Sequence, residues 1–103
     1  MKKPVITAIL ATLPLLATNA LAGDAAAGKA KAATCIACHG PAGISNNNLW
    51  PNLAGQKKGY LIKQLKDFRA GKRNDPLMKP MVQNLTDADI ENLAEYFSSL
   101  KSQ

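Results

Sequence analysis

The sequence predicts an all-α fold, and three observations lead to that prediction. No stretch shows the apolar–polar alternation that is typical of a half-buried strand. Residues 57–70 and 86–100 instead place apolar side chains at the spacing of an amphipathic helix. The chain has only 103 residues, which limits it to one domain and excludes multi-domain enzymes.

The first 22 residues have the features of a secretory signal peptide. Lys2 and Lys3 give a positive start, and an apolar run follows from Val5 to Leu16. Ala20-Leu21-Ala22 then forms a small-residue cleavage site. An uncleaved anchor is the alternative, but the run is too short to span a bilayer comfortably. We therefore expect cleavage after Ala22, a bacterial periplasmic location and no transmembrane segment in the processed chain.

Residues 23–103 would form the processed domain, which has few bulky core residues. It carries 11 basic and 7 acidic residues, a net charge of +4, and only five aromatic side chains. A domain of this size often needs a disulfide, a metal or a large cofactor to complete its core.

The most specific signal is Cys35-Ile36-Ala37-Cys38-His39, a C-x-x-C-H motif in an exported chain. This motif is the attachment signal of c-type haem. Positions i and i+3 share one face of a helix, so both thiols can reach the vinyl groups of one porphyrin. The adjacent imidazole of His39 can then bind the haem iron.

Three other interpretations of the cysteines are weaker. A thioredoxin-like pair expects a βαβ context, whereas the residues before Cys35 favour a helix. A zinc site needs further ligands, and the chain has one His and only two Cys. A structural disulfide would leave the position of the single His39 without an explanation.

Helix boundaries follow from capping and breaking residues. Asp24 can cap a first, alanine-rich helix that ends just after His39, where Gly40-Pro41 stops it. Residues 40–56 predict a long loop, which in so small a domain is usually functional. Gly71 suits the end of the helix over 57–70.

The last third of the chain is predicted to contain one loop and one helix. Residues 72–85 should be irregular, because Pro76 and Pro80 break any helix there. Thr86 can cap the final helix, whose first turn is acidic. The loop contains Met78 and Met81, and a thioether is a soft, neutral axial ligand for haem iron. The residues alone do not choose between these two methionines.

The whole predicted processed chain resembles the class I c-type cytochromes, specifically small mono-haem periplasmic proteins of the c-553-like kind and one half of the dihaem periplasmic cytochromes. The resemblance is carried by five separated segments: Cys35-x-x-Cys38-His39-Gly40, Trp50-Pro51-Asn52-Leu53-Ala54-Gly55-Gln56, Tyr60-Leu61-x-Lys63-Gln64-Leu65-x-Asp67-Phe68 with Gly71-x-Arg73, Met78-x-x-Met81, and Leu85-Thr86-Asp87-x-Asp89-Ile90-x-x-Leu93-Ala94-x-Tyr96-Phe97.

This resemblance implies a class I cytochrome c fold, with three to four main helices around one covalent haem c. Cys35 and Cys38 would hold the haem, and His39 would be the proximal ligand. Met78 would be the distal ligand, with Met81 as the alternative. The remaining implied haem contacts are the Pro51 carbonyl as acceptor for the imidazole, Leu53 on the porphyrin, and Trp50, Gln56 and Tyr60 near the haem or its propionates.

The resemblance also implies a crossing of the first and last helices, in which Gly28 and Ala32 meet Tyr96 or Phe97. It implies a soluble electron carrier rather than an enzyme, shuttling single electrons between respiratory partners. Two alternatives remain open: a dedicated haem subunit of a periplasmic redox complex, and a five-coordinate haem protein that binds gas or peroxide.

Basic residues are concentrated between positions 57 and 73. They are Lys57, Lys58, Lys63, Lys66, Arg69, Lys72 and Arg73. Such a cluster can be an ordinary solvated helix face, or it can steer the chain toward acidic redox partners such as membrane oxidase or reductase complexes. Export makes nucleic acid an improbable partner.

Overall fold

The computed structural model describes residues 1–9 and 23–103, and its described part is helical without strands. Much of the apolar run and the cleavage site of the predicted signal peptide lie outside the described residues. Residues 1–9 are exposed and contain no helix. Within the two described ranges, no helix is long and apolar enough to cross a membrane.

Two short helices, α1 (Ala25–Lys31) and α2 (Ala33–His39), occupy the region predicted as one helix. The carboxylate of Asp24 caps α1 by accepting hydrogen bonds from the backbone N–H groups of Ala26 and Ala27. Ala32 separates the two helices with φ −77° and ψ −1°. Gly40 ends α2 with a φ of 93°, a conformation that favours glycine.

Two longer helices, α3 (Lys58–Ala70) and α5 (Asp87–Ser99), match the periodic segments of the sequence. Gly71 ends α3 in the left-handed conformation, with a φ of 77°, as predicted. The hydroxyl of Thr86 accepts from the Asp89 N–H while the Asp89 carboxylate accepts from the Thr86 N–H. This reciprocal capping box fixes where α5 begins.

The prediction of an irregular segment over 72–85 was wrong in one part, because α4 (Met78–Val82) lies within it. Pro80 is the third residue of α4, where its missing N–H costs no intrahelical hydrogen bond. Asp75 starts the turn, since its Oδ1 accepts from the N–H groups of Leu77 and Met78. A proline that was expected to break a helix therefore sits in the first turn of one.

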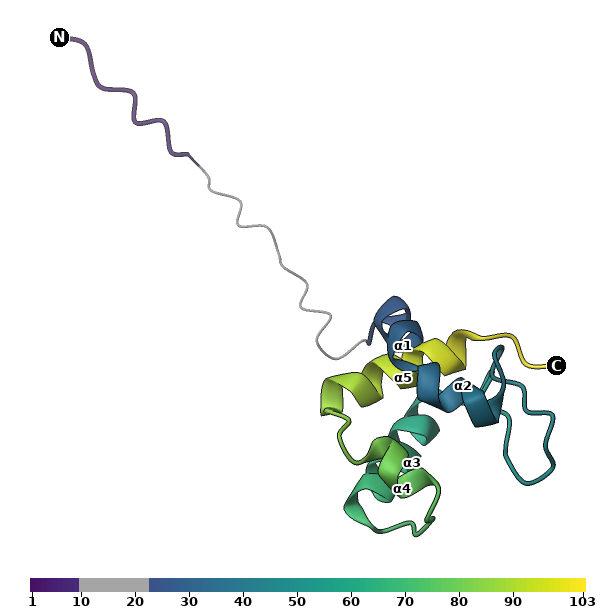
Figure 1. Cartoon of the computed structure of the whole chain (residues 1–103). Coiled ribbons are helices and arrows are strands. Elements are labelled where there is room, and N and C mark those ends of the chain that lie inside the picture. The colour runs from purple at the N-terminus through teal and green to yellow at the C-terminus, as the bar shows by residue number, and fades with distance from the viewer. Residues whose placement is uncertain (10–22) are drawn as a thin grey trace.

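The crossing of α1 and α5 forms one side of the core (Figure 1). A Cβ added to Gly28 would overlap the carbonyl group of Asn92 and lie 2.8 Å from Cβ of Tyr96. Ala32 packs in the same buried cluster as Phe97. The predicted contact of the first and last helices is confirmed, and a glycine inside α1 is explained by the close approach of α5.

The loop over 40–56 is tied to the helices by backbone hydrogen bonds. The Gly43 carbonyl accepts from the N–H groups of Leu53 and Ala54, and the Gly55 N–H donates to the Phe97 carbonyl. The loop thereby closes on itself and attaches to the end of α5. These bonds fix the segment that carries Pro51 and Leu53 beside α2.

Candidate functional site

A cavity of about 780 Å³ opens between α2, the 40–56 loop, α3, α4 and α5. Its inner wall is apolar and includes Leu61, Phe68, Leu93, Ala94 and Phe97, all of them buried. Every predicted site residue lies on its lining: Cys35, Cys38, His39, Trp50, Pro51, Leu53, Gln56, Tyr60, Met78 and Met81. The fold therefore gathers residues from four separate segments around one space.

The two cysteines lie on α2, one helical turn apart, and both are free thiols. Cys35 is half-buried and Cys38 is exposed. Burial raises the pKa of the Cys35 thiol above its usual value. This thiol therefore stays protonated at neutral pH, while both sulfur atoms remain available for bonds to a group inside the cavity.

The imidazole of His39 has one orientation fixed by the loop. Its Nδ1 lies 2.8 Å from the carbonyl oxygen of Pro51. A carbonyl can only accept, so Nδ1 carries the proton and donates, which leaves the lone pair on Nε2. His39 is only 7% exposed. A buried imidazole held in this orientation is suited to bind a metal centre through Nε2.

Both candidate methionines lie on α4 and line the cavity. They are three residues apart, so they share one face of this short helix. Met78 is partly buried, whereas Met81 is 47% exposed. Met78 is therefore the more buried of the two methionines, and its role as the distal ligand stays a prediction.

Some cavity residues were not singled out from the sequence as site residues. The Nη1 of Arg73 donates to Oε1 of Gln64 at 2.7 Å, and its guanidinium lies 4.4 Å from the centre of the Phe68 ring. Tyr60, Gln64 and Phe68 are spaced four residues apart on α3 and all line the cavity. This spacing could have identified Gln64 and Phe68 as site residues, because residues four positions apart lie on the same face of a helix. A cavity lined by Tyr60 is therefore lined by them too.

The cavity fits a haem better than a bare metal ion. Its volume lies within the range of cofactor sites, and its walls are mainly apolar. Within the described part of the chain, no cluster of three or more His, Cys, Asp or Glu side chains could hold a metal alone. A porphyrin brings four nitrogen ligands of its own, so two thiols and one imidazole are a sufficient donor set for attachment and proximal ligation.

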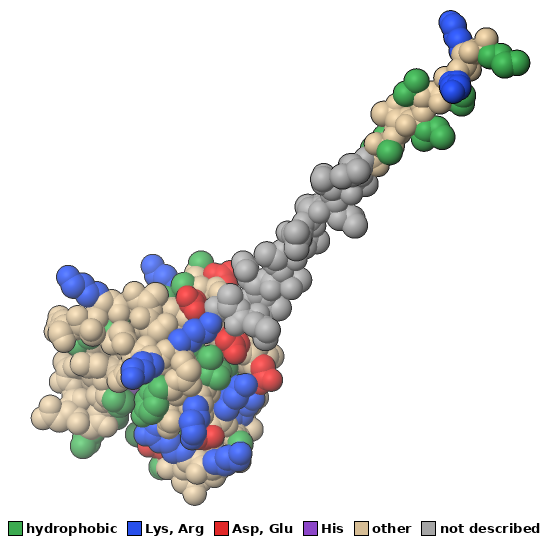
Figure 2. Space-filling model, turned by 180° about the vertical axis from the view of Figure 1, so that it is seen from behind, with side chains coloured by type: hydrophobic (Ala, Val, Ile, Leu, Met, Phe, Trp, Pro, Cys, Tyr) green, Lys and Arg blue, Asp and Glu red, His purple; other side chains and the backbone are tan. Residues whose placement is uncertain are grey.

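The basic residues of 57–73 do not form one continuous unpaired surface. Lys58 pairs with Glu95 at 3.0 Å, Lys63 pairs with Asp67, and Arg69 pairs with Asp87 at 2.6 Å. Figure 2 shows basic and acidic side chains next to one another on the face that it presents. Lys58 and Arg69 therefore join α3 to α5, whereas Lys63 pairs within α3.

Comparisons with known proteins agree with this site. Residues 25–101 match the family model described as Cytochrome c. The chain is 47% identical over 96 residues to cytochrome c4 of Pseudomonas aeruginosa, which covers 93% of this chain and 48% of that protein. It is 49% identical over 81 residues to cytochrome c-554(548) of Halomonas halodenitrificans, covering 76% of this chain and 98% of that one.

A third relative is a thiosulfate dehydrogenase electron acceptor of Thiomonas intermedia, which is 44% identical over 93 residues, covering 89% of this chain and 42% of that protein. Among solved structures, reduced recombinant cytochrome c4 from Pseudomonas stutzeri is similar with a TM-score of 0.74 and 46% identity. The match covers 78% of this chain and 47% of that chain.

The chain spans about half the length of the cytochrome c4 relatives that it matches. The shared fold, the family match over most of the chain and the donor set of the cavity lead to the same conclusion. Haem c, bound covalently, is the cofactor of this family. The chain belongs to the class I c-type cytochromes, as a mono-haem domain similar to one half of cytochrome c4.

Proposed function

We propose that residues 23–103 form a periplasmic carrier of single electrons, with one haem c attached through Cys35 and Cys38 and ligated by His39 and Met78. The observation that carries this proposal is the arrangement of the cavity. The two thiols and the oriented imidazole lie on α2, while the methionines on α4 line the same space. If His39 and Met78 both ligate the iron, no position on it would remain open for a substrate.

The haem supplies the change of iron valence, and the protein sets the conditions for it. The thiols of Cys35 and Cys38 retain the group permanently. The Pro51 carbonyl holds the His39 ring in place and makes it a stronger donor. The Met78 thioether is neutral and soft, which favours ferrous iron and raises the reduction potential. The apolar wall of the cavity excludes water, and this exclusion also raises the reduction potential.

Visible absorption spectroscopy of the protein purified from periplasm tests this ligation. We expect the red-edge band of methionine sulfur on ferric haem, and no spectral change when carbon monoxide is added to the ferrous protein. Met78→Ala should remove the band and allow carbon monoxide to bind. Met81→Ala is the matched control and should retain the band.

Two results would contradict the proposal. A wild-type protein without the band that binds carbon monoxide would have an open distal position, as expected of a gas- or peroxide-binding protein. Loss of the band only in Met81→Ala would identify Met81, one turn further along α4, as the distal ligand.

A second candidate function is that of a dedicated electron-accepting subunit in a periplasmic redox complex. It is favoured by the similarity to a protein named as the electron acceptor of thiosulfate dehydrogenase. The two functions use the same haem site, so spectroscopy does not separate them. Purification from periplasm at low ionic strength does: a free carrier elutes as a single small protein, whereas a subunit elutes with a larger partner.

The partners of a free carrier would be acidic redox proteins, such as membrane oxidase or reductase complexes. The net charge of +4 on residues 23–103 supports electrostatic steering toward them. Electron transfer should therefore slow as the salt concentration rises.

A further inference from the structure

A second, shallow recess lies where the first residues of the domain meet α5, and it shares no lining residue with the haem cavity. It has a volume of about 520 Å³ and is lined by the first residues of the domain and one face of α5, with Gly23, Asp24, Glu91, Asn92 and Glu95 among them. We propose that this recess binds the α-ammonium group that cleavage after Ala22 would create on Gly23. The inference rests on the export step of the proposed function.

Gly23 is held against α5 in the structure. A Cβ added to it would lie 2.6 Å from the carbonyl oxygen of Glu91 and 3.0 Å from Cβ of Glu95. Its φ of 73° is a conformation that favours glycine. The next residue is fixed as well, because the Asp24 N–H donates to Oδ1 of Asn92 at 2.8 Å. Gly23 is therefore held in place at the recess that it lines.

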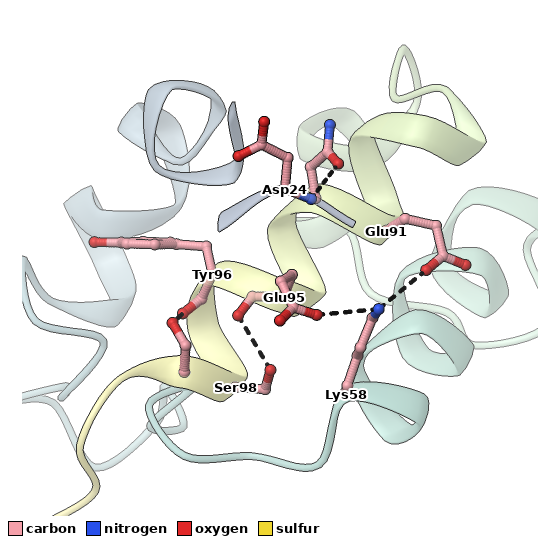
Figure 3. A network of polar contacts seen from close by, with 8 residues as sticks. Asp24, Lys58, Glu91, Glu95, Tyr96 and Ser98 are labelled. Carbon is pink, nitrogen blue, oxygen red and sulfur yellow. Dashed lines mark hydrogen bonds and ion pairs between the residues drawn. The ribbon is translucent and has the colours of Figure 1, made fainter. Parts of the chain in front are cut away.

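The charged side chains at the recess have a negative sum. Nζ of Lys58 lies 3.0 Å from a carboxylate oxygen of Glu95 and 3.6 Å from one of Glu91 (Figure 3). One lysine thus serves two carboxylates, which leaves one negative charge. The carboxylate of Asp24 adds another while it caps α1. A new ammonium group would complete a network of alternating charges across α1, α3 and α5.

A positive charge on Gly23 also needs negative charges nearby to compensate it. An ammonium group just before α1 lies at the positive end of that helix, where a cation is disfavoured. Glu91 and Glu95 would offset this, because both line the recess. In the precursor, the Gly23 nitrogen is an uncharged amide. The recess would gain its second cation only when the signal peptide is removed, so processing would strengthen the folded state of the exported protein.

The test uses haem-loaded protein purified from periplasm, with mass spectrometry to verify each N-terminus. Insertion of Gly-Ser-Gly between Ala22 and Gly23 moves the ammonium group up to about 10 Å away and leaves the domain otherwise unchanged. We expect the insertion to lower the thermal midpoint by about 2–6 °C at pH 7. In a Glu91→Gln/Glu95→Gln background the same insertion should lose most of its effect.

A control background, Asp67→Asn, removes a carboxylate outside the recess and should preserve the full effect of the insertion. The difference in thermal midpoint between the wild type and the insertion variant should also shrink as the pH rises above about 8. The reason is that an amine next to carboxylates gives up its proton at a higher pH in the folded than in the unfolded chain.

Three results would overturn the proposal: an N-terminus other than Gly23, an insertion without effect, or an equal effect in the Gln background. None of these results depends on the visible spectrum. That spectrum reports on the haem site and tests the proposed function separately.

Discussion

The imidazole Nδ1 of His39 donates a hydrogen bond of 2.8 Å to the carbonyl oxygen of Pro51, twelve residues further along the chain. This bond joins the end of α2 to a loop that has no helix of its own. The loop is also held by hydrogen bonds to the Gly43 carbonyl, by one from the Ser45 N–H to Oδ1 of Asn52, and by one from Gly55 to the end of α5. The proximal side of the proposed haem site thus depends on a few contacts that meet at the cavity.

Removal of the haem should largely unfold the domain. The buried apolar side chains of the described residues are few, and several of them, such as Leu61, Phe68 and Leu93, form the wall of the cavity. Without a group in this space, water reaches the apolar wall and much of the hydrophobic stabilisation is lost. We expect a Cys35→Ala/Cys38→Ala chain to show little helical circular dichroism at 25 °C. Native helix content in this variant without haem would contradict the expectation.

Close packing at Gly28 should make it one of the least tolerant positions in α1. A methyl group there would overlap the Asn92 carbonyl on α5, so we expect Gly28→Ala to lower the free energy of unfolding by about 1–3 kcal/mol. Gly59 is a matched control, because a Cβ added to it meets nothing within 4 Å. Gly59→Ala should stabilise α3 by about 0.5–1 kcal/mol. Denaturant titration of the holoprotein measures both, and equal effects would show that α1 and α5 are less closely packed.

Several of these features could be predicted from the sequence because their signals are local. The C-x-x-C-H motif, the Thr86 cap and the Gly71 terminus each depend on residues within a few positions of one another, and the structure has the cap and the terminus where expected. The contact at Gly28 was implied by the resemblance.

Other features depend on relationships that a linear pattern does not contain. Pro80 was taken as a helix breaker because its position relative to a helix start at Met78 was unknown. The pairing of Arg69 with Asp87 spans 18 residues and follows from how α3 lies against α5. The charge cluster was therefore visible in the sequence, while its partial neutralisation was not.

Acid should weaken the start of α5 through Asp89. Hydrogen bonding to the Thr86 backbone, with a smaller contribution from nearby Lys31, lowers the pKa of the Asp89 carboxyl below its ordinary value. A carboxyl with a lowered pKa stabilises the folded state above its unfolded pKa, near 3.9, and loses that contribution as the pH falls through the folded value. We expect Asp89→Asn to flatten the decline in stability between about pH 4 and pH 2.

The measurement is denaturant unfolding of wild type and variant at each pH, followed by the helical signal. The difference between the two removes the shared acid dependence of haem ligation. Thr86→Ser keeps the hydroxyl acceptor and the reciprocal bonds, so it should retain the wild-type decline. If the stability of Asp89→Asn declined with falling pH as the wild type does, the capping box would not depend on the charge of Asp89.

Structural and steering roles of the basic residues can be separated with two variants. Arg69 donates 2.8 Å and 2.6 Å hydrogen bonds to the Leu85 carbonyl and the Asp87 carboxylate, and these join α3 to the start of α5. Arg69→Gln/Asp87→Asn leaves the net charge unchanged but weakens this link. We expect it to lower the thermal midpoint by about 3–6 °C, because the Leu85 carbonyl loses its strong donor.

Lys72 is exposed at the end of α3, one residue before Arg73 on the cavity lining. Lys72→Gln removes one positive charge near the cavity. We therefore expect association with an acidic redox partner to slow about twofold at low salt. Its thermal midpoint should stay near the wild-type value. Stopped-flow electron transfer at two salt concentrations measures the rates. If the neutral Arg69/Asp87 double variant slowed association as much as Lys72→Gln, the rate would depend on the integrity of α3 and α5 rather than on net positive charge.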